Sequence, residues 1–179
     1  MSTSNDNVVD MYGDEKKSLI AVQTATFIAL IAVGSWISIP LGPVPFTLQT
    51  LFVILAGTVM KRYAVLPAVL YMVLGAINLP VFHNGLAGIG VLLGPSGGYI
   101  MGFIPAAAIV GLAYEKNTRI SKISGIIAGT AVIYLTGILW LAYSTGMTLF
   151  GAFLVGVVPF VIGDILKGIS AYIIADRIS

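Results

Sequence analysis

Cysteine is absent from this chain of 179 residues. Disulfide bonds, thiolate catalysis and cysteine metal sites are therefore excluded, and the redox compartment stays open. Histidine occurs only at His83, and one imidazole without a second ligand is weak ground for a metal site. We therefore expect no bound metal, and we expect His83 to pack within a loop or lie at the surface. No GxxxxGK[ST] pattern occurs, so the sequence predicts no P-loop for ATP.

Charged residues are also scarce. They make up 9% of the chain, whereas soluble domains usually contain about 25%. Hydrophobic residues make up 58%, and the mean hydropathy is +1.03. Membrane lipid is therefore the expected solvent of this protein. The formal net charge of +2 comes from scattered basic residues, which form no patch for nucleic acid.

The length limits the number of membrane spans. Because a helix needs about 20 residues to cross a bilayer, this chain fits five or six spans and has no room for a soluble catalytic domain. Residues 1–17 are mostly polar, and we expect a mobile cytoplasmic tail that is not cleaved. Residues 18–179 are expected to form an all-α integral membrane domain. Its six predicted transmembrane helices are 18–39, 47–60, 63–79, 99–114, 123–143 and about 149–175.

The positions of the basic residues favour six spans over five. Eight of the nine fall in the termini and in alternate connections, which lie on one side: Lys16, Lys17, Lys61, Arg62, Lys116, Arg119, Lys122 and Arg177. The connections on the other side, 40–46, 80–98 and 144–148, contain no Lys, Arg, Asp or Glu. Since basic loops stay in the cytoplasm, this pattern predicts a multi-pass plasma-membrane protein with both termini cytoplasmic.

Two residues that are ionisable at neutral pH lie within one predicted span. A charge at mid-bilayer costs about 2.5 to 3.5 kcal/mol, so Asp164 and Lys167 should face the bundle interior or water. Their spacing places both on one helix face, and Pro159 and Gly163 should loosen the helix just before them. We interpret the pair as a binding site with one acceptor charge and one donor charge. A purely structural ion pair and a proton relay are the alternatives.

Small residues mark two further features. Ala21, Ala25 and Ala29 form a smooth stripe on the first predicted span. Such a stripe allows close helix approach, either to another membrane subunit or within the bundle. The outer segment 83–98 contains six glycines and is expected to fold as a close-packed lid.

Four segments resemble the BioY family, namely 43–49 (PVPFTLQ), 79–82 (LPVF), 90–99 (GVLLGPSGGY) and 163–167 (GDILK). Members of this family are biotin-binding S components of energy-coupling-factor (ECF) vitamin transporters. The resemblance implies an ECF S-component-like fold that binds biotin on the outer side. It also implies association with a transmembrane T component and two ABC-type ATPases. ATP would act only on those ATPases, and this chain would be neither an enzyme nor a cofactor protein.

The resemblance further implies the binding residues. Asp164 would accept from a ureido N–H of biotin, and Lys167 would donate to a ligand oxygen, either in the ureido ring or in the carboxylate. The other residues implied for the site are apolar walls and polar partners: Phe46, Phe82, Tyr99, Gln49 and Asn84.

Other functions fit the sequence less well. The closest alternative is an S component for a different vitamin. A small ion-coupled secondary transporter would usually show internal repeats, and we find no convincing duplication between 18–80 and 98–175. An intramembrane enzyme would need a nucleophile with its base or a metal cluster, and the sequence shows neither.

Overall fold

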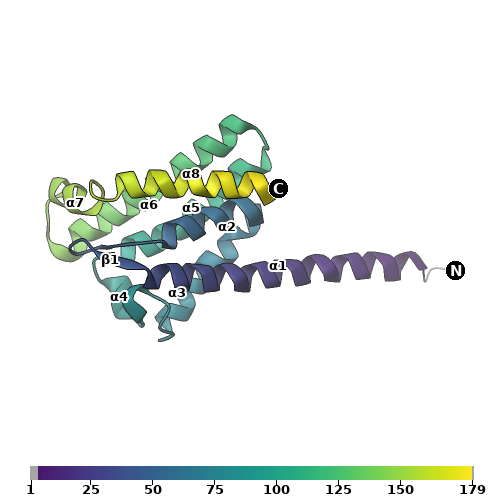
Figure 1. Ribbon diagram of the computed structural model, residues 1–179. Helices are drawn as coiled ribbons and strands as arrows, with labels where there is room; N and C mark the ends of the chain where they lie inside the picture. The colour runs from purple at the N-terminus through teal and green to yellow at the C-terminus, as the bar shows by residue number, and fades with distance from the viewer. Residues whose placement is uncertain (1–3, 179) are drawn as a thin grey trace.

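The computed structural model describes residues 4–178 as a helical bundle with one short β-hairpin (Figure 1). Its helices and strands in chain order are α1 (Ser4–Trp36), β1 (Ser38–Pro40), β2 (Pro45–Thr47), α2 (Gln49–Met60), η1 (Lys61–Ala64), α3 (Val65–Ala76), η2 (His83–Gly85), α4 (Ile89–Leu93), α5 (Gly97–Glu115), α6 (Arg119–Thr145), α7 (Leu149–Gly156) and α8 (Val161–Ile178).

The helices account for six passages through the bundle. By length and hydropathy, the described residues contain four candidate spans, and a fifth if the bent pair α7 and α8 is counted as one. The candidate Gln49–Ala76 is not straight, because Lys61 takes a φ of +54° and η1 separates α2 from α3. Gln49, at the start of α2, donates to the hydroxyl of Tyr71 in α3. The two helices therefore fold back on each other, which agrees with the six spans predicted from sequence.

Several boundaries differ from the prediction. Residues 4–17 of the predicted tail continue α1 as a helix, while residues 1–3 lie outside the described residues; the mobility of the tail stays a prediction. Around the connection 40–46, Ile39 pairs with Phe46 in an antiparallel hairpin, which the sequence analysis did not predict. The last span is bent by 57° between α7 and α8. Pro159 lies in this break and favours it, because a proline inside a helix removes a backbone hydrogen bond.

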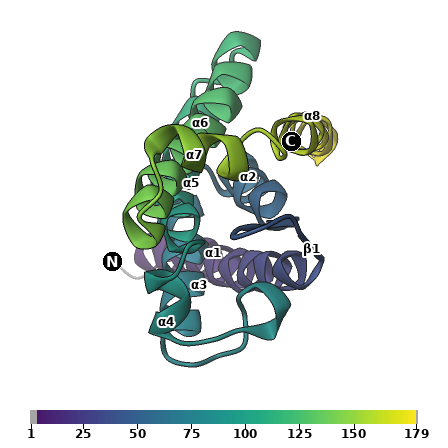
Figure 2. The same cartoon turned by 90° about the vertical axis from the view of Figure 1, so that its left-hand side faces the viewer.

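α5 is the central helix of the bundle and packs against α2, α3 and α6 (Figure 2). Small residues allow this close packing. A Cβ at Gly102 of α5 would meet Thr136 of α6, and a Cβ at Gly129 of α6 would meet Val110 of α5. Helices in membranes associate through such close approaches, because burial of apolar surface brings no gain between lipid-facing helices.

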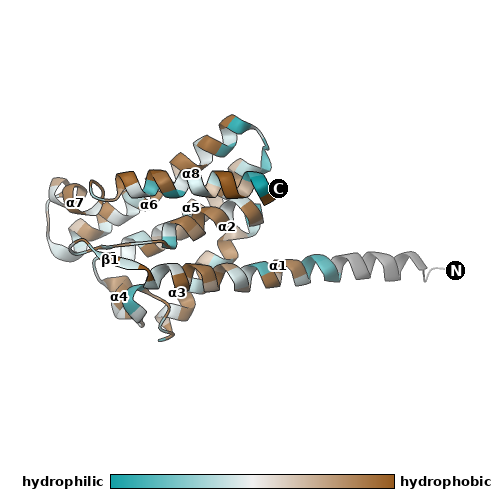
Figure 3. Ribbon diagram, in the orientation of Figure 1, coloured by the Kyte–Doolittle hydropathy of each residue, from teal (hydrophilic) through white to brown (hydrophobic). Residues whose placement is uncertain are grey.

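The two ends of the bundle differ in charge. Both termini and the α5–α6 turn lie at one end, and the β-hairpin, α4 and α7 lie at the other (Figure 1). The first end carries the basic residues: Arg62 pairs with Glu115 at 2.6 Å, and Lys122 lies 5.5 Å from the ring centre of Tyr114. Between the ends, apolar residues cover most of the helices (Figure 3). This distribution fits helices that cross a membrane.

Candidate ligand-binding site

A pocket lies near the uncharged end, where α8 begins beside β2, α2, α5 and α6. It encloses about 50 Å³. Five of the residues predicted for the site line this pocket: Phe46, Gln49, Tyr99, Asp164 and Lys167. These five residues come from four elements, β2, α2, α5 and α8, so the structure brings together side chains from distant parts of the sequence.

Asp164 and Lys167 form a buried ion pair in the first turns of α8. Nζ of Lys167 lies 2.7 Å from Oδ1 of Asp164, and the two side chains are 6% and 7% exposed. Their spacing of three residues places them on one face, as predicted. Breaking such a pair by removing one partner leaves a buried charge and is strongly destabilising.

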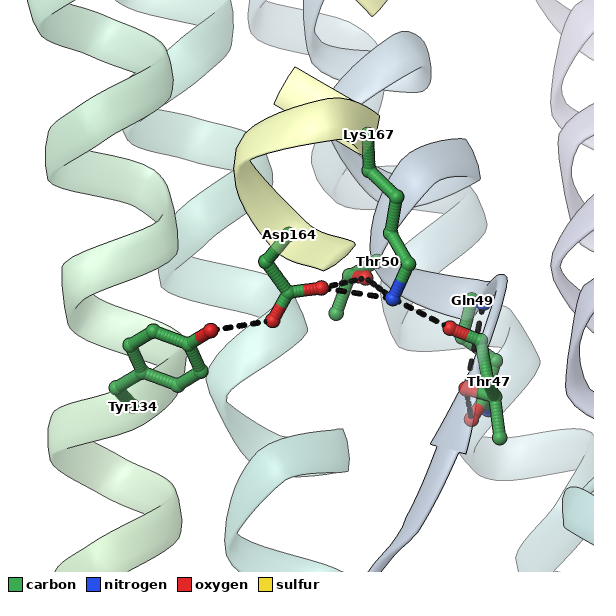
Figure 4. A network of polar contacts seen from close by, with 6 residues as sticks. All are labelled: Thr47, Gln49, Thr50, Tyr134, Asp164 and Lys167. Carbon is green, nitrogen blue, oxygen red and sulfur yellow. Dashed lines mark hydrogen bonds and ion pairs between the residues drawn. The ribbon is translucent and has the colours of Figure 1, made fainter. Parts of the chain in front are cut away.

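Hydroxyl and carbonyl groups complete the hydrogen bonds of the pair (Figure 4). Lys167 also donates to the carbonyl of Thr47 at 2.6 Å and to the hydroxyl of Thr50 at 3.0 Å, so all three of its donors have acceptors. The carboxylate of Asp164 accepts from Thr50 at 3.2 Å and from the hydroxyl of Tyr134 in α6 at 2.5 Å. Both charges are therefore held in fixed positions by three neighbouring elements.

Phe46 packs against the same pair. Nζ of Lys167 lies 3.7 Å from the centre of its ring, a cation–π contact. The ring also stacks on Phe160, with centroids 6.1 Å apart. A Cβ at Gly163 would meet the Phe46 ring, so glycine at this position allows the ring to reach α8. This explains why a glycine directly precedes Asp164.

Gln49 connects the pocket to the outer loop. Its side-chain oxygen accepts from Thr47 at 2.8 Å, and its amide donates to the hydroxyl of Tyr71 at 2.6 Å. The Tyr71 hydroxyl donates to the carbonyl of Val81 at 2.8 Å. Gln49 therefore has its polar atoms engaged within the protein and holds the loop after α3 in place.

Phe82 and Asn84 do not line the pocket. Phe82 is fully buried behind it, edge-on to Tyr71 with ring centroids 5.6 Å apart, and fills the space beside Gly75. Asn84 is exposed and takes a φ of +57°, a left-handed conformation that asparagine tolerates. In this structure Phe82 supports the loop from the core, and Asn84 provides the left-handed residue of the turn.

Tyr99 lines the pocket. Its hydroxyl donates to the carbonyl of Gly156 at 2.9 Å, which joins α5 to the end of α7. A Cβ at Gly137 would meet its ring, so the close approach of α6 depends on glycine there.

His83 also lines the pocket, although we expected it to lie at the surface or pack in the loop. Its Nε2 lies 3.1 Å from the Ser96 hydroxyl, and its Nδ1 is buried with no hydrogen-bond partner among the described residues. Burial lowers the pKa of His83, so the imidazole is neutral at pH 7. A serine and histidine in contact could suggest catalysis. A triad also needs a group that orients Nδ1, and none of the described residues supplies it.

Sequence reasoning missed several residues of the site. Thr47 lies within a segment that resembles the family, and Thr50 follows shortly after, but neither carries a charge that would attract attention. Tyr134 is one of several aromatic residues in the spans, and only its contact with Asp164 distinguishes it. The signal that could have identified Tyr134 was its hydroxyl group in the middle of a long apolar helix.

Comparisons with known proteins agree with this architecture. A sequence profile of the BioY family matches residues 8–179. The biotin transporter BioY of Thermotoga maritima is 45% identical over 159 residues, which cover 88% of this chain and 94% of that protein. The probable biotin transporter BioY of Pyrococcus horikoshii is 44% identical over 155 residues, covering 86% and 92%.

A solved structure has the same fold. The crystal structure of the S-component for biotin from an ECF-type ABC transporter superposes with a TM-score of 0.83 at 26% identity, and covers 91% of this chain and 92% of its own. The all-α bundle with six passages is therefore an ECF S-component fold. Sequence and structure together place the chain in a known family: it belongs to the BioY family.

Proposed function

We propose that this chain is the high-affinity biotin-binding S component of an ECF-type importer, which captures biotin on the outer side of the plasma membrane for ATP-driven uptake. Relatives named as biotin transporters match most of its length, and so does a solved S-component for biotin. The observation that carries the proposal is the buried pair of Asp164 and Lys167 in a pocket at the uncharged end.

The chemistry of biotin suits this pair. Its ureido ring has two N–H donors and one carbonyl acceptor on adjoining edges. Asp164 accepts from an N–H, and Lys167 donates to a ligand oxygen. Phe46 and Tyr99 line the same pocket and provide apolar surface for the thiophane ring. The neutral His83 imidazole and the Ser96 hydroxyl supply further polar contacts at the loop side.

Ligand binding requires side chains to move. The pocket encloses about 50 Å³, whereas ligand pockets usually measure about 300 to 1,000 Å³. Because Lys167 and Asp164 bond to each other at 2.7 Å, a ligand between them exchanges that bond for two bonds of its own. The loss is small if the ligand satisfies both charges.

Equilibrium binding of radiolabelled vitamins to the purified protein tests the function directly. We expect saturable binding of biotin and no comparable binding of the other vitamins in the panel. Tighter binding of another vitamin would make this chain an S component for that compound. Uptake by the chain alone, driven by an ion gradient in proteoliposomes, would instead favour a small secondary transporter.

The partners in this proposal are a transmembrane T component and ABC-type ATPases. The chain has no P-loop, so in this proposal ATP binds only to the partner ATPases. The role proposed for the chain itself is ligand binding, without a cofactor or a catalysed reaction. The stripe of Ala21, Ala25 and Ala29 supports a docking role for α1. These three side chains are exposed, although Ala32 is buried at 7% exposure. Small exposed residues on a membrane helix allow another helix to approach closely.

Replacing Ala25 with Trp should weaken assembly with the partner subunits and leave biotin binding intact. Overpacking a close helix contact costs about 1 to 3 kcal/mol, which corresponds to about 5- to 150-fold in affinity. Co-purification with the T component and biotin titration measure the two effects. Ala128→Trp, at an exposed alanine of α6, is the matched control. Normal co-purification of the Ala25→Trp variant would show that docking occurs elsewhere.

The charge asymmetry of the bundle predicts that the α5–α6 turn faces the cytoplasm. Because the chain has no native cysteine, single cysteines report accessibility without background. We expect an impermeant thiol reagent on intact cells to label Leu86→Cys, at an exposed position of the outer loop, and to spare Thr118→Cys. The opposite labelling pattern would show that the chain has the inverted orientation in the membrane, with the pocket near the cytoplasmic side.

A further inference from the structure

A groove runs along the side of the bundle between α6 and α8. Its volume is about 630 Å³. Figure 2 shows α6 and α8 standing apart beyond the link that joins them through α7. Most residues along the groove are apolar, including Ile123, Ile127, Ile165 and Ile169, which belong to the exposed side of the two helices.

The polar groups in the middle of the groove are already bonded within the protein. The hydroxyl of Thr130 donates to the carbonyl of Ile126 in the same helix at 3.0 Å. The hydroxyl of Tyr134 donates to Asp164, and this bond separates the groove from the ligand pocket, since both residues line both spaces. The middle of the groove therefore presents surface suited to hydrocarbon.

One end of the groove has a different character. Arg119 and Tyr172 line it at the end of the bundle that carries the basic residues. Arg119 is exposed, and no carboxylate among the described residues lies within ion-pair distance of it. Tyrosine and arginine are residues of the membrane interface, and a cation there attracts anionic lipid headgroups.

The length of the groove can be compared with the thickness of the bilayer. Fifteen residues separate Arg119 from Tyr134 on α6, which is about 22 Å at 1.5 Å per residue. One leaflet of the hydrocarbon core is about 15 Å thick, so the groove extends past the middle of the bilayer.

We propose that the groove between α6 and α8 binds one acyl chain of an anionic phospholipid, with the lipid phosphate at Arg119. The apolar walls match the chain, and the cation at one end, which has no ion-pair partner among the described residues, matches the headgroup. The chain end reaches the Tyr134–Asp164 bond, so the lipid supports the wall of the ligand pocket from outside. This site depends on the membrane location of the chain and not on which vitamin it binds.

Native mass spectrometry tests the proposal on protein released from nanodiscs that contain equal amounts of phosphatidylglycerol and phosphatidylcholine. We expect the wild-type protein to retain one lipid, mainly phosphatidylglycerol. Ala131→Trp, which fills the groove, should lose this lipid, whereas Ala128→Trp, at an exposed position of α6 that does not line the groove, should keep it. Arg119→Gln should reduce the preference for phosphatidylglycerol by about fivefold, and Lys116→Gln, an exposed cation outside the groove, should not.

Three outcomes would overturn the proposal. Equal lipid retention by the Ala131→Trp and Ala128→Trp variants would show that the groove holds no lipid. An unchanged preference for phosphatidylglycerol in the Arg119→Gln variant would show that Arg119 does not bind the lipid phosphate. If Ala131→Trp abolished a dimer or a partner complex and kept its lipid, the groove would be a protein interface instead. Biotin titration on the same samples reports on the vitamin site separately, so its failure leaves the lipid result interpretable.

Discussion

Asp164→Asn or Lys167→Met is expected to lower the affinity for biotin by about 10- to 150-fold. Each change removes a charge-assisted hydrogen bond to the ligand, worth about 1.5 to 3 kcal/mol. The double variant should bind biotin worst of all. Titration of biotin into the four proteins, wild type included, measures these effects, with thermal stability in detergent as the control for folding.

The same set of variants separates a binding role from a structural one. The pair is already satisfied in the protein, because Lys167 bonds to Thr47, Thr50 and Asp164, and Asp164 also accepts from Tyr134. If the pair were only structural, either single change would strand a buried charge, and the double change would relieve that cost. Biotin affinity close to wild type in a well-folded double variant would therefore rule out both residues as ligand contacts.

Tyr134→Phe provides a graded comparison within this set. It keeps both charges of the pair and removes only the hydroxyl that donates to Asp164 at 2.5 Å. Its effect on biotin affinity should therefore be smaller than that of either charge substitution.

Gly97→Ala is expected to destabilise the protein by about 1 to 3 kcal/mol, the usual cost of forcing extra atoms into a close-packed site. A Cβ at Gly97 would overlap the carbonyl group of Leu92 in α4, and a backbone group cannot rotate away as a side chain can. The loop must move as a whole. Because Ser96 lines the ligand pocket beside Gly97, biotin affinity should fall together with the melting temperature.

Gly90→Ala is the matched control for this prediction. Gly90 lies in α4 of the same loop, and a Cβ there would meet no other atom within 4 Å. The two variants add the same methyl group, so only the space around it differs. Equal melting temperatures for both would show that the loop is too adaptable to act as the close-packed lid expected from its glycines.

Much of the architecture could be predicted from sequence because its signals are local. Long uncharged stretches identify membrane helices wherever they occur, since the cost of a charge in lipid does not depend on which neighbours are present. The basic residues Lys61, Arg62 and Lys116 likewise indicate, from composition alone, which connections lie at the same end of the bundle. The same reasoning identified Asp164 and Lys167, because two buried charges three residues apart on a helix must share a face.

Contacts between distant segments were decided by the tertiary structure. Tyr134 lies thirty residues before Asp164 in the sequence, and Thr50 more than a hundred. These residues meet because small residues such as Gly102 and Gly129 let α5 and α6 pack closely and so set the position of α6 beside α8. Which helices become neighbours depends on the packing of the whole bundle. Local hydropathy and charge do not indicate which helices become neighbours.

The outer loops show the same division. The sequence indicated that glycines allow a compact loop over 83–98, but it could not distinguish residues that face the pocket from those that face the core. Phe82 turned inward to fill the space beside Gly75, and His83, its neighbour, turned to the pocket. An irregular backbone has no fixed period, so adjacent side chains can point in unrelated directions. The family and the charged pair were therefore determined by the sequence, whereas the walls of the site were determined only when the helices packed.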